Sequence, residues 1–362
     1  MLDADAFAAL LCDWCLEVEQ AQQVLVSSTT LAEPLGVALH RALLQRGAWP
    51  LVRLVPPALQ ADFYAHAGDL QLDGFAPIDL VEAQTLDALL GIDAPANTRA
   101  LSAVEPERIA RRMNARKPVQ EAILSRRWAG TLWPTAALAQ EGGMSEHDYE
   151  AFVRGALFLD RADPIAAWAE LSSRQAALVQ RLGEAREIRI EADGTDVRLR
   201  VDGRRWINSD GRRNMPSGEV FTAPLEDSAN GTIRFTVPSR SGGVEVADVE
   251  LTFDAGEVVA ARADRGDGYL QSRLAMDPGA RYLGELGIGT NTGIDRATGS
   301  TLLDEKIAGT VHLALGRSYP ETGGTNASAL HWDLICDLRA GGRLTVDGEP
   351  LELDEFTSGT KQ

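Results

Sequence analysis

The chain has 362 residues, with 35 Lys or Arg against 53 Asp or Glu, which leaves a formal net charge of −18. This charge argues against a phosphate-binding surface and hence against sequence-independent nucleic-acid binding. Three Cys are too few for a disulfide framework, and no uncharged apolar run is long enough to span a membrane. The N-terminus lacks the basic start of a signal peptide, so we expect a cytoplasmic protein.

The first half of the chain alternates between helical and strand patterns. Helical patterns cover residues 4–18, 31–46 and 57–65, strand patterns cover 23–27 and 50–55, and weaker alternation continues to about residue 135. Regular alternation of this kind predicts βαβ units around a parallel sheet. A dinucleotide-binding domain would place glycines in the turn after the first strand. That turn reads Ser27-Ser-Thr-Thr30, so the dinucleotide hypothesis fails.

Cys12 and Cys15 form a CxxC motif inside the first helical pattern. A redox or zinc site would need a thioredoxin-like context or a second pair of ligands, and neither accompanies the motif. The spacing places both thiols on one helix face. We therefore interpret them as buried structural residues, because free Cys often packs as a small apolar side chain.

The predicted secondary structure changes from helices to short strands near residue 185. Helices are predicted over 145–158 and 164–182, and short alternating strands follow from Glu187 onward. Asp-Gly turns such as Asp193-Gly194 and Asp347-Gly348 separate these strands, which indicates antiparallel hairpins. The sequence therefore predicts an α/β N-terminal domain with a parallel sheet (residues 1–185). A β-rich α+β domain (residues 186–362) follows it.

Potential metal ligands gather in the β-rich half. His331 and Asp333 are two residues apart, and a strand would place both side chains on one face. Such a pair binds a divalent ion, or it forms a plain hydrogen-bonded pair. His312 lies in another strand-like run, and Glu219 and Glu285 each follow a glycine, which lets a metal approach the backbone. Two His and three carboxylates exceed one tetrahedral site and suit two ions with a shared ligand.

The other three His differ from this set. His40, His66 and His147 lie in helical patterns without ligand partners, so we interpret them as surface or core residues. The scarcity of His in this chain therefore leaves His312 and His331 as the candidates for metal binding.

Four motifs carry a resemblance to a known family. They read SDGRRNMPSGEVFTAP at 209–224, ELGIGTN at 285–291, DEKIAGTVHLALGRSY at 304–319 and HWD at 331–333. These motifs resemble the thermophilic-type metalloaminopeptidases, the aminopeptidase T and aminopeptidase S family of two-metal exopeptidases. The similarity extends loosely over the N-terminal half, which is shorter than in the longer family members.

The resemblance implies metal ligands, a reaction and partners. The ligands would be Glu219, Glu285, His312, His331 and Asp333. Two divalent ions (Zn, Co, Mn or Mg) would activate a water molecule that hydrolyses the N-terminal peptide bond of a substrate with a free amino group. Tyr319 matches a family tyrosine near the metals and would stabilise the oxyanion, and Glu285 is the candidate general base. The family also implies a homodimer.

Two alternatives remain open from the sequence. His312, His331 and Asp333 alone would form the triad of a mononuclear non-haem iron ring-cleaving dioxygenase on the same scaffold. The presence of Glu219 and Glu285 favours hydrolysis, because a single-iron triad does not need them. A non-catalytic peptide-binding relative would use the edges of the β-rich half, but it would have no need of five ligands.

Overall fold

The computed structural model describes residues 2–241 and 244–357. The chain forms two compact units, residues 1–165 with 211–215 and residues 166–210 with 216–362. The proposed domains 1–185 and 186–362 stay a prediction. In the described part of the chain, no helix has the length and apolar composition that crossing a membrane requires.

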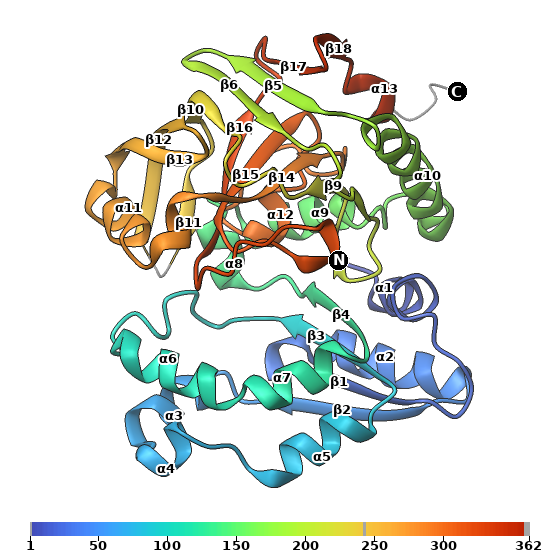
Figure 1. The fold of residues 1–362 in the computed structure, drawn as a ribbon. Coiled ribbons are helices and arrows are strands. Elements are labelled where there is room, and N and C mark those ends of the chain that lie inside the picture. Colours follow the sequence, from blue (N-terminus) through green and yellow to red (C-terminus); the bar gives the residue numbers. More distant parts are fainter. Residues whose placement is uncertain (1, 242–243, 358–362) are drawn as a thin grey trace. The chain divides into compact units, whose positions relative to one another are not determined.

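The first unit is built on a five-stranded sheet in which every neighbouring pair is parallel. The strands run in the order β2-β1-β3-β4-β8, with bounds β1 Gln23–Thr29, β2 Trp49–Val55, β3 Ala88–Asp93, β4 Arg127–Leu132 and β8 Asn214–Met215. The helices of this unit are α1 Ala4–Leu10, α2 Glu33–Gln45, α3 Leu59–His66, α4 Asp69–Leu72, α5 Pro77–Thr85, α6 Pro106–Ala115, α7 Lys117–Leu124, α8 Ala136–Glu141 and α9 Glu146–Ala156, of which α2 and α7 lie beside the sheet in Figure 1.

The sequence signals explain where these elements begin. Asp3 caps α1 by accepting hydrogen bonds from two backbone N–H groups, and Ser145 caps α9 by accepting one, from the N–H of Asp148. The first predicted helix continues past α1 as a π-helical turn, Leu11–Cys15, and ends there rather than at residue 18. Cys12 and Cys15 are buried and form no disulfide with a described residue, in agreement with their interpretation as buried structural residues.

The second unit contains two antiparallel sheets. A five-stranded sheet has the order β16-β15-β14-β9-β7, with bounds β7 Ile207–Ser209, β9 Glu219–Thr222, β14 Leu283–Gly289, β15 Thr310–Gly316 and β16 His331–Asp337. The other sheet contains β5 Glu187–Ala192, β6 Thr195–Arg200, β10 Asn230–Phe235, β11 Ser239–Ser241, β12 Val244–Asp254, β13 Glu257–Arg265, β17 Arg343–Val346 and β18 Glu349–Leu351. The helices of the second unit are α10 Pro164–Leu182, α11 Asp267–Leu274, α12 Thr301–Asp304 and α13 Asp354–Thr357. Short 3₁₀ turns occupy Thr30–Ala32 in the first unit and Pro278–Arg281 and Pro320–Thr322 in the second.

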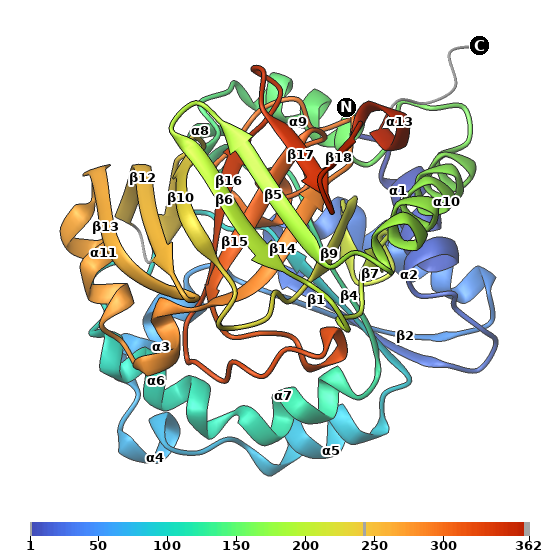
Figure 2. The same cartoon turned by 45° about the horizontal axis from the view of Figure 1, so that its top comes forward.

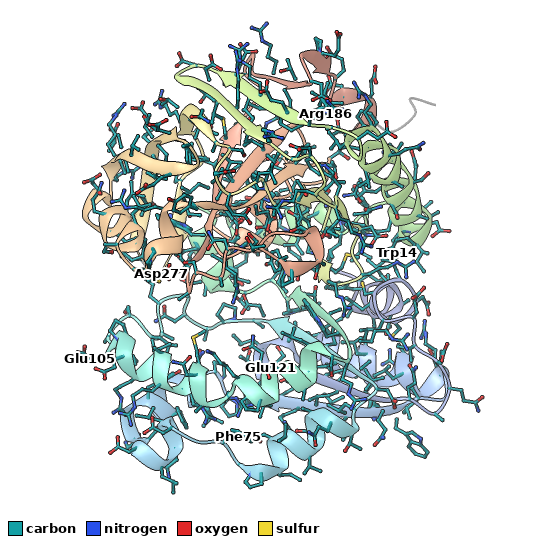
Figure 3. The ribbon with its side chains drawn as sticks, viewed as in Figure 1. Trp14, Phe75, Glu105, Glu121, Arg186 and Asp277 are labelled. Carbon is teal, nitrogen blue, oxygen red and sulfur yellow. The ribbon has the colours of Figure 1, made fainter. Side chains whose placement is uncertain are left out.

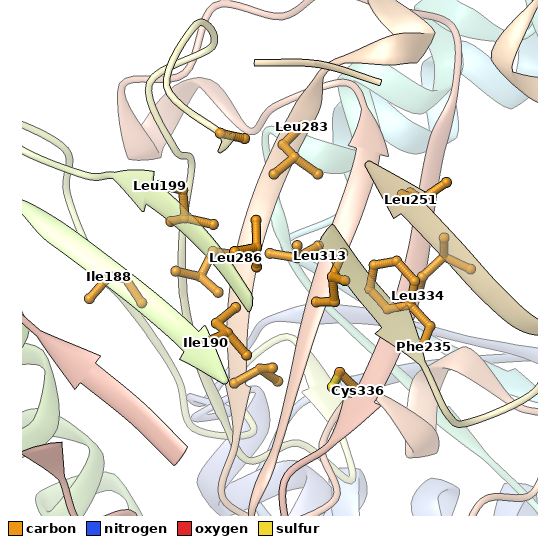
Figure 4. Packing of buried hydrophobic residues seen from close by; sticks show 14 of the residues in the cluster. Ile188, Ile190, Leu199, Phe235, Leu251, Leu283, Leu286, Leu313, Leu334 and Cys336 are labelled. Carbon is orange, nitrogen blue, oxygen red and sulfur yellow. The ribbon is translucent and has the colours of Figure 1, made fainter. Parts of the chain in front are cut away.

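An apolar core fills the space between the two sheets of the second unit. In Figure 2 the hairpin β5–β6 lies across β14, β15 and β16. Ile188 and Leu199 from this hairpin pack in one buried cluster with Leu286, Leu313 and Leu334 from the five-stranded sheet (Figure 4). The predicted Asp-Gly turn at Gly194 has φ +68°, a backbone conformation that glycine adopts without steric cost. The two kinds of sheet confirm the predicted fold class.

Candidate metal centre

The alternation of side chains along the five-stranded sheet creates the candidate centre. In β15, Val311, Leu313 and Leu315 enter the apolar core between the sheets, so His312 points to the opposite face. In β16, Trp332 and Leu334 belong to the same core. The opposite face of β16 therefore carries His331 and Asp333, and that of β9 carries Glu219. The face of this sheet that turns away from the core thus receives its His and carboxylates.

A bulge in β14 moves Glu285 onto this face. Leu283 pairs with Leu315, but Glu285 then pairs with Ala314, so Gly284 is the extra residue. The bulge shifts the alternation by one position, so that Leu283 and Leu286 both enter the core and Glu285 does not. A Cβ at Gly284 would lie 2.3 Å from two carbonyl oxygens, which explains why glycine occupies the bulge.

Gly287 makes room for the first imidazole. It pairs directly with His312 across β14 and β15. A Cβ at this position would lie 2.1 Å from His312 Cε1 and Nε2, far inside van der Waals contact. The ring of His312 therefore occupies the space that a side chain at position 287 would take. This explains why the ELGIGTN motif has a glycine at that position.

The five predicted ligands come together in two groups that share Glu285. His312 Nε2 lies 3.2 Å from Glu285 Oε1 and 3.6 Å from Glu219 Oε2. His331 Nε2 lies 3.7 Å from the other oxygen of Glu285 and 3.7 Å from Asp333 Oδ1. In each group of three residues, the potential ligand atoms all lie within 4.8 Å of one another.

Buried charge is concentrated at this centre. Among the described residues, the buried acidic and basic side chains are Glu219, Glu285, Asp304, Lys306 and His312. Acids elsewhere, for example Glu105 and Glu121, occupy exposed positions (Figure 3). Because a buried charge is costly unless it is paired or binds a metal, this concentration marks a site rather than a packed core.

Several polar atoms of the candidate ligand residues lack a hydrogen-bond partner. Glu219 Oε2, Glu285 Oε2, His312 Nδ1 and Asp333 Oδ1 are buried atoms without a hydrogen-bond partner among the described residues. Buried polar atoms are rarely left unsatisfied, and carboxylate oxygens beside imidazole nitrogens are suitable donors for a divalent ion. The donor set therefore fits the metals that the sequence predicts.

The orientation of His331 fits the same chemistry. Its Nδ1 lies 2.8 Å from the backbone carbonyl oxygen of Arg317. A carbonyl oxygen only accepts, so Nδ1 donates this hydrogen bond, and Nε2 is the ring nitrogen that faces Glu285 and Asp333. Metal-binding His residues commonly use one nitrogen for a backbone carbonyl or carboxylate in this way, which holds the ring for the metal.

The structure adds two residues that the ligand prediction missed. Glu305 groups with His312 and Asp333 as a further set of potential ligands. Lys306 is fully buried, forms an ion pair with Glu305, and places its Nζ 3.4 Å from Glu219 Oε1. The signal in the sequence is the acid–lysine pair at the start of the DEKIAGTVH motif, which strand periodicity does not connect to His312.

Burial and charge shift the pKa values in this cluster. Burial raises the pKa of Glu219 to about 7 and that of Asp333 to about 6. Burial by itself would lower the pKa of His312, but the carboxylates of Glu285 and Glu219 raise it to about 9. Burial also opposes the ionised form of Glu305, but the Lys306 ammonium holds the pKa of Glu305 below its usual value.

Tyr319 lies beside the ligand cluster. Its ring makes an edge contact with His331 at a centroid distance of 5.1 Å, and it packs against Phe221 at 5.7 Å. The residue is 39% exposed. Burial of its hydroxyl group and the nearby carboxylates raise the pKa of Tyr319, so the phenol stays protonated at neutral pH and is available as a hydrogen-bond donor.

Comparison with known proteins decides the family. Residues 3–350 match the family described as thermophilic metalloprotease (M29). The chain belongs to this family. Among its M29 relatives, aminopeptidase 2 of Geobacillus stearothermophilus is 30% identical over 99% of this chain and 97% of that protein. Aminopeptidase T of Thermus thermophilus is 32% identical over 62% of this chain and 61% of that protein.

A solved M29 structure agrees with the fold. Wild-type AmpT from Thermus thermophilus matches with a TM-score of 0.82 and 26% identity, over 96% of this chain and 97% of that chain. The predicted family is thus confirmed, and the chain is a metalloprotease, an enzyme that hydrolyses peptide bonds. The specific roles of the five ligands and Tyr319 stay predictions.

Proposed function

We propose that this M29 metalloprotease is an aminopeptidase that releases N-terminal residues from peptides, using water activated by two divalent metal ions. The observation that carries the proposal is the pair of ligand groups joined by Glu285. The relatives at 30% and 32% identity bear the name aminopeptidase, which supports the same reaction class.

The ligand groups suggest how two ions would be held. Glu219, Glu285 and His312 would hold one ion, and Glu285, His331 and Asp333 would hold the other. The two oxygens of Glu285 face different imidazoles, so this carboxylate is suited to bridge the ions. Glu305 groups with His312 and Asp333 and is an additional candidate ligand.

The ions would activate the water molecule, and protein side chains would stabilise the oxyanion and accept the proton. Divalent ions lower the pKa of bound water towards about 7 and polarise a carbonyl group. The Tyr319 hydroxyl would donate a hydrogen bond to the oxyanion of the tetrahedral intermediate, because its raised pKa keeps the proton in place. Glu285 stays our candidate for the group that accepts the proton of the attacking water.

Other features stay part of the proposal. The metals are two ions of Zn, Co, Mn or Mg, the substrates are peptides with a free amino terminus, and the enzyme is a cytoplasmic homodimer. The ring-cleaving dioxygenase finds no support, because the family and the named relatives are peptidases. Five clustered ligands also give no reason to prefer a non-catalytic peptide-binding protein.

The test begins with protein that has been stripped with a chelator and then supplied with one metal at a time. Metal content per chain is measured together with hydrolysis of dipeptides and longer peptides, each with a free and an acetylated N-terminus. We expect about two equivalents of metal and cleavage of the free peptides only. One equivalent of iron with oxygen uptake, or equal cleavage of acetylated peptides, would refute the proposal.

A further inference from the structure

One residue outside the ligand set is tied directly to it. Gln175 lies in the middle of α10 and is fully buried. Its side-chain Nε2 donates to the carbonyl oxygen of Glu219 at 2.8 Å, and it lies 3.0 Å from Thr290 Oγ1 and 3.3 Å from the Ser209 carbonyl oxygen. A single amide group thus contacts three segments of the five-stranded sheet.

The three acceptors lie where the strands end. Ser209 is the last residue of β7, Glu219 is the first residue of β9, and Thr290 follows the last residue of β14. The orientation of the Gln175 amide is determined by its surroundings, because two main-chain carbonyl groups require an N–H group opposite them. Its Oε1 is buried without a hydrogen-bond partner among the described residues. The three contacts of Nε2 thus leave the other polar atom of the Gln175 amide unsatisfied, which costs free energy.

Glu219 needs such support more than the other predicted ligands do. Strands β14, β15 and β16 have seven residues each, whereas β9 has four and its outer neighbour β7 has three. Gly218 precedes Glu219 with φ +115°, in the region that glycine enters most readily. The backbone of Glu219 thus sits at the end of a short strand beside the most permissive residue type.

We propose that Gln175 is a positioning residue for the metal centre. By holding the Glu219 backbone, it keeps the Glu219 carboxylate in place beside His312 and Glu285. This inference rests on the proposed function, because it assumes that Glu219 is a metal ligand. It assigns to α10, a helix that carries none of the predicted ligands, a direct effect on metal affinity.

The test compares Gln175→Met with the wild-type enzyme. Methionine keeps the length of the side chain and its fit in a helix but removes the amide donor. Cobalt binding is titrated against a competing chelator, so that the readout does not depend on peptide cleavage. We expect one of the two metal equivalents to bind about tenfold to a hundredfold more weakly, while the other changes little. At saturating cobalt, kcat should recover more fully than at limiting cobalt.

Ser172→Ala is the matched control. Ser172 lies one turn earlier on α10 and donates to Asp210 Oδ2 at 2.7 Å, so its loss removes a contact between this helix and the chain near β7 without touching Glu219. We expect cobalt affinity within about twofold of the wild type, as for a change that touches no ligand. Equal weakening by both variants, or unchanged affinity for both equivalents in Gln175→Met, would overturn the proposal.

A second variant keeps the test decisive if Gln175→Met does not fold. Thr290→Val removes one acceptor of the amide but preserves the shape of the side chain. We expect a weakening of the same equivalent by several-fold, and no weakening would overturn the inference. If the wild-type enzyme bound no metal at all, the proposed function itself would fail. If it bound two equivalents that neither variant affects, only the role of Gln175 would fail.

Discussion

The parallel sheet of the first unit and the five-stranded sheet of the second differ in the kind of polar group that they bury: hydroxyl groups in the first, and also carboxylates and an imidazole in the second. In the first, the Ser28 hydroxyl donates to the Ile92 carbonyl oxygen at 2.8 Å, and Thr29 donates to the Ala94 carbonyl oxygen at 2.6 Å. In the second, buried atoms of Glu219 and Asp333 have no hydrogen-bond partner among the described residues. One hydroxyl of the parallel sheet, Thr131 Oγ1 in β4, also has no partner among the described residues. An unpaired buried carboxylate costs far more than an unpaired hydroxyl, so the carboxylates of the second sheet indicate a ligand that the protein does not itself supply.

Among these predictions, loss of the Glu285 carboxylate should reduce peptidase activity most. Glu285→Gln keeps the shape of the side chain but removes the charge that both ligand groups share. We expect peptidase activity to fall by at least about a thousandfold, since groups that act as a unit fail together. Metal analysis should show both equivalents weakened, whereas Glu219→Gln should weaken one. Two tightly bound ions in Glu285→Gln would contradict the bridging role.

A glycine in each sheet allows a direct comparison. Gly287→Ala would place a Cβ 2.1 Å from the His312 ring, whereas a Cβ at Gly91 in β3 would meet no atom within 4 Å. Displacement of the imidazole should reduce activity by about a hundredfold, because small misplacements of a reacting group are costly. Gly91→Ala should leave the kinetic constants near those of the wild type. Similar losses in the two variants would show that the effect comes from general strain.

The pH dependence of stability should separate metal-free from metal-loaded enzyme. The folded-state pKa values of Asp333, Glu219 and His312 are raised to about 6, 7 and 9, so the folded chain binds more protons than the unfolded chain. The contribution of these groups to the stability of the folded state is fully present at pH values below their unfolded-state pKa values. It is lost as the pH rises through their folded-state pKa values.

Thermal unfolding should therefore show that the midpoint of the chelated protein falls by roughly 5 °C between pH 6 and pH 9. The metal-loaded protein should not show this loss, because metals bind the deprotonated ligands. A chelated protein that gains stability over this range would contradict the raised pKa values.

Both units contain buried Cys residues, and thiol reactivity is where we expect the smallest difference between the units. Burial raises the pKa of the Cys12 thiol to about 12 and that of Cys336, on β16, to about 11. Thiolate is the reactive form, so neither thiol should react with an aromatic disulfide reagent at pH 8 while the protein is folded. In denaturant, all three Cys should react. Rapid reaction of one thiol in the folded protein would show that its unit opens locally.

The sequence predicted much of the fold because its signals are local. The capping residue Ser145 and the first-turn Pro164 mark the starts of α9 and α10, and glycine with positive φ closes the hairpin at Asp193-Gly194. The same local reasoning overextended the first helix, because hydrophobic periodicity does not show that the α-helix gives way to a π-helical turn at Leu11.

The composition of the candidate site was also accessible from the sequence. His331 and Asp333 share a face because a strand alternates with a period of two, and the motifs pointed to Glu219, Glu285 and His312. Their convergence was not accessible in the same way. The bulge at Gly284 reverses the alternation along β14, and without it Glu285 would face the apolar core.

The sequence by itself determined the fold class, the family and five of the residues that can donate to a metal. Only the tertiary structure decided that Glu285 is shared, that Lys306 is buried against Glu219, and that Gln175 reaches the Glu219 backbone from a helix. The physical reason is the distance along the chain over which each interaction acts. Helix caps, turns and alternation act over a few residues, whereas these contacts depend on strand register and on the packing of a helix against strand ends.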